Sequence, residues 1–148
     1  MRTLAVILVI ALGLGVASAR GMRSWSYKEL VEASDVIAII TPSKTVLRKE
    51  KAPLPDMTGV EGQRVETEFT VVVMLKGSLT DPKHLLLHHY KDIRTGGIAN
   101  GPLLVAFDPK EKFQYLAFLK KGADGQYTAV TGQTDPWFSY EKLQTKAF

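Results

Sequence analysis

The sequence predicts a mainly β fold: a small five-stranded barrel with one short helix before its first strand. Three observations support this prediction. Residues 65–75 repeat with the period of two of a strand: one face carries mostly apolar side chains, and the other is polar up to Thr70 before Val72 and Met74 make both faces apolar. Residues 36–40 form a compact β-branched run that is too short for an ordinary helix. Asp124-Gly125 lies between two apolar runs, and this dipeptide tolerates the positive φ of a tight hairpin turn.

The expected elements follow in order along the chain. Ser26 and Glu29 have the spacing of a capping box, which predicts a short helix that ends near residue 34. Strands are expected at residues 36–40, 65–75, 84–90, 115–119 and 126–131. Residues 48–63 combine charges, prolines and glycines without periodicity, which predicts a long exposed loop. Residues 139–144 are expected to form one or two helical turns. An open five-stranded barrel of the oligonucleotide/oligosaccharide-binding (OB) type fits this strand count.

The first nineteen residues predict a cleavable secretory signal. Arg2 gives a positive start, residues 4–16 are apolar and uncharged, and Ala17-Ser18-Ala19 has the small-x-small pattern of a cleavage site. Those thirteen apolar residues are fewer than the roughly 20 that a bilayer span needs; a retained short anchor is the alternative. Cleavage after Ala19 leaves one domain, residues 20–148, without a membrane span, and predicts a secreted or periplasmic protein.

Composition excludes several kinds of chemistry. The chain has no cysteine, so disulfides, thiol catalysis and thiolate metal sites are absent. Its 19 Lys and Arg residues against 15 Asp and Glu are scattered, which argues against a polybasic surface for nucleic acid or lipid headgroups. No serine lies in a Gly-x-Ser-x-Gly elbow, and the glycines match no phosphate-binding or dinucleotide-binding pattern. We therefore expect no cofactor.

Three stretches resemble a pattern in exported bacterial proteins of unknown function. They are Glu29-Leu30 with Ala33-Ser34-Asp35-Val36-Ile37-Ala38, Thr67-Glu68-Phe69-Thr70-Val71 with Leu75-Lys76-Gly77, and Tyr115-Leu116-Ala117-Phe118-Leu119-Lys120. Those proteins are similar in fold to the tissue inhibitors of metalloproteinases and the netrin module, so the resemblance implies an OB-type barrel over most of residues 26–131. The inhibitors insert a cysteine-led amino terminus into the zinc site of a protease. This chain has no cysteine, so the resemblance does not extend to that mechanism.

Histidines and paired glutamates suggest an enzyme as the alternative function. At about 3.3 Å per strand residue, His84 and His88 lie about 13 Å apart, and His89 faces the opposite side, so we expect no metal site. Glu66 and Glu68 lie about 6.6 Å apart by the same rise, a separation that suits glycoside hydrolysis. Polar residues continue the row on both sides, however, as is typical of a solvated outer face. A small extracytoplasmic hydrolase or metal-dependent enzyme around these histidines is therefore only the alternative.

The segment after the last expected strand, residues 132–138, combines polar groups with two aromatic rings. Exposed aromatic rings beside loop amides bind sugars or peptides in barrel modules; alternatively, Trp137 and Phe138 close the open end of the barrel. The leading hypothesis is a non-enzymatic exported binding module that contacts an envelope protein or a glycan, and not nucleic acid. Its candidate ligand-binding residues are His88, Tyr90, Gln133, Asp135 and Trp137.

Overall fold

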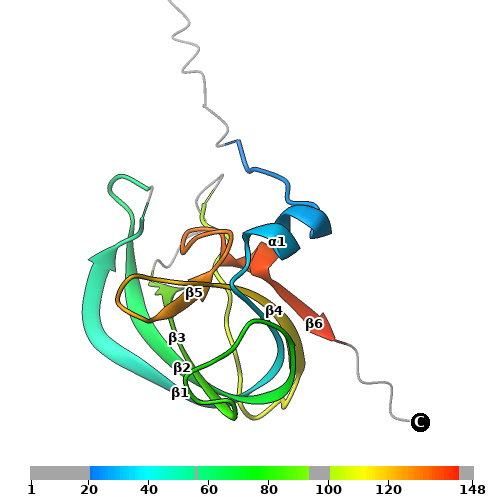
Figure 1. Ribbon diagram of the computed structural model, residues 1–148. Helices are drawn as coiled ribbons and strands as arrows, with labels where there is room; N and C mark the ends of the chain where they lie inside the picture. Colours follow the sequence, from blue (N-terminus) through cyan, green and yellow to red (C-terminus); the bar gives the residue numbers. More distant parts are fainter. Residues whose placement is uncertain (1–20, 56, 94–100, 144–148) are drawn as a thin grey trace, which may run out of the picture.

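The structure is a computed structural model that describes residues 21–55, 57–93 and 101–143 (Figure 1). The predicted signal, residues 1–19, lies outside the described residues. The elements are α1 (Tyr27–Ala33), β1 (Val36–Pro53), β2 (Glu61–Lys76), β3 (His84–Asp92), β4 (Gln114–Lys121), β5 (Tyr127–Ala129), the 3-10 helix η1 (Pro136–Ser139) and β6 (Tyr140–Leu143). Among the described residues, no helix is both long and apolar enough to cross a membrane.

Five of the strands close into a ring. The order is β1-β2-β3-β5-β4, and β4 pairs back onto β1, so that the sheet has an inner and an outer face. All neighbours are antiparallel except β3 and β5, which are parallel and joined only at Leu87 and Tyr127. The mainly β, OB-like fold with one helix before the first strand is therefore confirmed.

A sixth strand lies outside the ring and corrects the prediction for the C-terminal segment. Residues 139–144 were expected to be helical, but β6 pairs with β4 from Gln114 to Ala117. Tyr140 begins β6 and is buried against the core. A strand here buries the Tyr140 side chain in the core and pairs the backbone groups along the edge of β4. An isolated helical turn would do neither and is not stable by itself.

The prediction of a long exposed loop at residues 48–63 is also wrong. β1 continues to Pro53, β2 begins at Glu61, and the two strands remain paired to their ends, as the upper left of Figure 1 shows. The pairing slips between Leu47 and Lys51, where the strand carries its charged residues. A register irregularity of this kind bends a strand and changes the direction of its side chains.

The core fills the inside of the ring and centres on Phe107. Its ring meets Phe69, Tyr115 and Tyr140 edge to face, with centroid distances of 4.8–5.1 Å. Edge-to-face pairs at such distances add about 0.5–1.5 kcal/mol each beyond their buried area. Phe107 belongs to no helix or strand, so a connecting segment supplies the central ring of this core.

The helix α1 begins with the predicted capping box. The Glu29 amide donates to the Ser26 hydroxyl, and the Ser26 amide donates to the Glu29 carboxylate. The hydrogen bonds that the Ser26 amide, the Arg23 guanidinium and the Ser26 hydroxyl donate to the carboxylate lower the pKa of Glu29 to about 2. Leu30 packs the helix against Ile37 and Phe118 on the outside of the ring.

Gly77 ends β2 at a close approach between two chain segments. It has φ +75°, and a Cβ there would lie 2.0 Å from the Asp35 carbonyl oxygen. Gly59 has the same φ but open space around it. We expect Gly77→Ala to lower the free energy of unfolding by about 2–4 kcal/mol, and Gly59→Ala by only about 1 kcal/mol, because the second change carries the left-handed strain alone. Urea unfolding measures both; equal losses would contradict this account.

Candidate functional site

The strands β2 and β3 divide their side chains between the core and the outer face. On β2, Val65 and Thr67 point inward and are buried, whereas Glu66 between them points outward. On β3, His89 is buried in the core, and His88 and Tyr90 lie on the outer side. Outward residues of the two strands therefore stand side by side, because Glu66 pairs with His88 in the register.

A cavity of about 570 Å³ lies over this outer face. β1 contributes Arg48 and Glu50, β2 contributes Arg64 and Glu66, and β3 contributes His88 and Tyr90. The opposite wall comes from the β4–β5 hairpin and the chain after it, through Asp124, Gln126, Thr128 and Gln133. The cavity thus spans three neighbouring strands and is bordered by the β4–β5 hairpin, which follows β3 in the ring.

An ion pair between Arg48 and Glu66 stands in the cavity wall. The Arg48 guanidinium donates to Oε2 of Glu66, while Nδ1 of His88 lies 3.6 Å from Oε1. The hydrogen bond from Arg48 lowers the pKa of Glu66 and raises that of Arg48. Glu66 is therefore an ionised acceptor at neutral pH, and it is a poor candidate for the general acid of a hydrolase, which needs a raised pKa.

His89 lies beneath the cavity as part of a buried polar chain. Its Nε2 is 2.9 Å from the Thr67 hydroxyl, which is 3.0 Å from the Thr45 hydroxyl. Thr45 in turn donates to the Phe107 carbonyl at 3.3 Å. Burial lowers the pKa of His89 to about 4, so the ring is neutral at pH 7. Both histidines border the cavity, but His89 is buried and His88 is partly exposed there.

Three of the five candidate ligand-binding residues come together in this cavity. His88, Tyr90 and Gln133 all line it, and Nε2 of Gln133 donates to the His88 carbonyl at 2.8 Å. Asp135 lies elsewhere: its carboxylate accepts from the Leu103 amide at 3.1 Å and so ties two connecting segments together.

Trp137 also lies outside the cavity. Its side chain is 58% exposed and borders a different, aromatic pocket, so it does not close an end of the ring. The five residues therefore do not form one site.

For several cavity residues, no pattern in the sequence indicated a place in a binding site. Arg48 and Glu50 fall in the stretch expected to be a loop, Asp124 in an ordinary hairpin turn, and Gln126 at the start of the strand expected after it. Each is a polar residue in a polar stretch. Pairing between strands makes them neighbours: β1 pairs with β2, and β5 pairs with β3, which brings the β4–β5 hairpin beside β3.

The histidines of β3 have different carboxylate partners. His84 lies 3.1 Å from Asp81, and His88 lies beside Glu66. In the part of the chain that the structure describes, no three His, Asp or Glu side chains gather in a way that could hold a metal ion. Glu68 is exposed and does not line the cavity, so it does not act with Glu66 on one substrate there.

Comparison with known proteins assigns no family to the chain. No family model matches the chain, and no curated protein matches it.

The buried His89 makes stability depend on pH. Its pKa is about 4 in the folded protein, against about 6.5 when the chain is unfolded. Between these values the unfolded state binds the extra proton, so stability falls as the pH falls from about 6.5 to about 4, by about 3 kcal/mol in all. In His89→Gln this contribution should vanish. Urea unfolding at several pH values measures it, with His84→Gln as the exposed control; an unchanged slope in His89→Gln would refute the assignment.

Proposed function

We propose that this chain is an exported binding module that holds a neutral, hydroxyl-rich glycan in the cavity across β2 and β3. The observation that carries the proposal is the charge balance of the lining. Arg48 and Arg64 face three carboxylates, those of Glu50, Glu66 and Asp124. A wall that carries positive and negative side chains close together does not favour an anionic or a cationic ligand. It does offer hydrogen-bond donors and acceptors to hydroxyl groups, which can both donate and accept.

The uncharged lining points to the same ligand class. Gln126, Thr128 and Gln133 add amide and hydroxyl groups, and Tyr90 adds an aromatic ring. Sugars bind through hydrogen bonds to such groups and through contact with aromatic faces. Single-stranded nucleic acid instead needs a basic groove with several stacking rings, which this lining lacks.

The shape of the site favours an elongated ligand. A second cavity of about 260 Å³ meets the first at His88 and Gln126 and continues along β3 to His84 and Asp81. His84 and Tyr90 are six residues apart on this strand, which corresponds to roughly 20 Å. A short stretch of polysaccharide fits such a groove better than a single sugar does.

The fold and the predicted export agree with this function. OB-type barrels bind oligosaccharides and oligonucleotides over strands 2 and 3 and beside the hairpin between strands 4 and 5, and the cavity occupies that place. This is an analogy at the level of the fold. A secretory signal and the resemblance to exported bacterial proteins of the tissue-inhibitor and netrin type would place the module where envelope glycans are found.

Affinity electrophoresis through gels that contain a neutral polysaccharide (β-glucan, mannan or galactan) tests the proposal. At least one of them should retard the protein. Glu66→Gln should weaken binding about tenfold, because a charged acceptor is lost from the cavity. Glu68→Gln is the matched control: it changes the next outward carboxylate of the same strand, outside the cavity.

Two outcomes would count against the glycan. One is that no neutral polysaccharide retards the protein; the other is that Glu68→Gln weakens binding as much as Glu66→Gln. Capture of an envelope protein that depends on Glu66 and Tyr90 would instead assign the cavity to a protein partner.

A further inference from the structure

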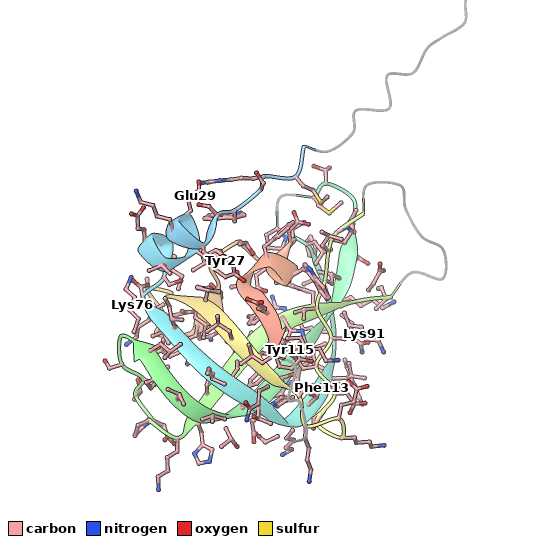
Figure 2. All side chains as sticks on the ribbon, turned by 90° about the vertical axis from the view of Figure 1, so that its right-hand side faces the viewer. Tyr27, Glu29, Lys76, Lys91, Phe113 and Tyr115 are labelled. Atoms are coloured by element: carbon pink, nitrogen blue, oxygen red, sulfur yellow. The ribbon has the colours of Figure 1, made fainter. Side chains whose placement is uncertain are left out.

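An aromatic pocket, separate from both cavities described above, lies where α1, η1 and β6 meet. It is on the side of the ring that faces the viewer in Figure 2, with Tyr27 between the helix and β6. Its volume is about 320 Å³. Aromatic rings dominate its wall: Trp25, Tyr27, Phe118, Trp137 and Phe138. It shares no lining residue with the cavity over β2 and β3, so the two sites are separate.

Two of these rings are not needed for the core. Tyr27 is 60% exposed and Trp137 is 58% exposed, although large aromatic side chains usually bury most of their surface. They come from opposite ends of the described chain, one from the start of α1 and the other from η1. Exposed rings that converge on one pocket from distant parts of a chain indicate a surface for a ligand.

The pocket also contains a carboxylate without a cationic partner. Glu141 accepts a hydrogen bond from the Tyr27 hydroxyl, which raises the pKa of Tyr27. Among the residues that the structure describes, no Lys, Arg or His forms an ion pair with Glu141. Within the described residues, the Glu141 carboxylate therefore lines the aromatic pocket without an ion-pair partner, although Lys142 lines the same pocket.

Lys142, which also lines the pocket, and Arg23, next to Trp25 on the chain, contact other partners. Nζ of Lys142 lies 3.1 Å from the centre of the Phe113 ring and 4.0 Å from the Glu111 carboxylate. Arg23 pairs with Glu29 at 3.0 Å and stacks over Trp25 at 4.0 Å. The second contact shows that one indole of the pocket already receives a cation on its face.

We propose that this aromatic pocket binds an organic cation, a quaternary ammonium or a protonated primary amine, between its rings and the Glu141 carboxylate. The faces of aromatic rings attract a cation that has lost its water, and Trp is the strongest of them. The carboxylate adds direct attraction and repels anionic ligands. The same chemistry is presented by a choline-type headgroup and by a lysine side chain.

Intrinsic fluorescence tests the proposal directly, because Trp25 and Trp137 are the only tryptophans of the chain and both line the pocket. The protein recovered after expression of the full chain is titrated with choline and with n-butylamine, an analogue of the lysine side chain. We expect saturable changes with a Kd on the order of 1 mM for at least one probe. Tighter binding of choline would identify a headgroup as the source of the cation, and tighter binding of n-butylamine a lysine side chain.

Two comparisons distinguish a cation site from an apolar hollow. Glu141→Gln should weaken binding about tenfold while it keeps an acceptor for Tyr27, whereas Glu111→Gln, which alters only the partner of Lys142, should bind like the wild type. The neutral isostere 3,3-dimethylbutanol should bind at least tenfold more weakly than choline to the unaltered protein. Equal binding of choline and its isostere, or full binding by Glu141→Gln, would overturn the proposal.

Discussion

The structure depends on the pairing of β4 with β1, from Val36–Leu119 to Ile40–Tyr115, which closes the ring. Once the sheet is closed, every strand residue faces either the core or the outside. Ala38, Ile40, Ala117 and Leu119 meet near this seam, and none of them is exposed. Because the chain has no cysteine, its stability rests on this burial and on the rings around Phe107, and no covalent link supports it.

The closed ring also explains why neighbouring residues have opposite roles. His88 and His89 are adjacent in sequence, yet His88 stands in the cavity beside Glu66 and His89 is buried against Thr67. A shift of β3 by one residue would exchange them, placing the His88 ring in the core and removing it from the cavity. The core and the cavity therefore fix the register of β3 together.

Local patterns in the sequence predicted the parts of the fold that depend on local interactions. The capping box at Ser26, the alternation along β2 and the Asp124-Gly125 turn each involve residues close in sequence, so their physical cause is visible there. The extension of β1 through Arg48 and the strand at Tyr140 depend instead on partners in β2 and β4. The cavity was only partly predictable for the same reason. His88 and Tyr90 follow from the alternation of one strand, whereas Arg48 and Asp124 join them only through the pairing of β1 with β2 and of β5 with β3.

The two proposed sites differ in the pairing of a charge more than in its residue type. Both contain a strand glutamate. Glu66 is neutralised by Arg48 at the cavity wall, so it can accept a hydroxyl group without selecting for charge. In the described part of the chain, Glu141 accepts from the Tyr27 hydroxyl without an ion-pair partner, and it lies beside rings that themselves attract cations. The two proposed ligand preferences rest on this difference, an arginine that pairs with Glu66 and no such partner for Glu141 among the described residues.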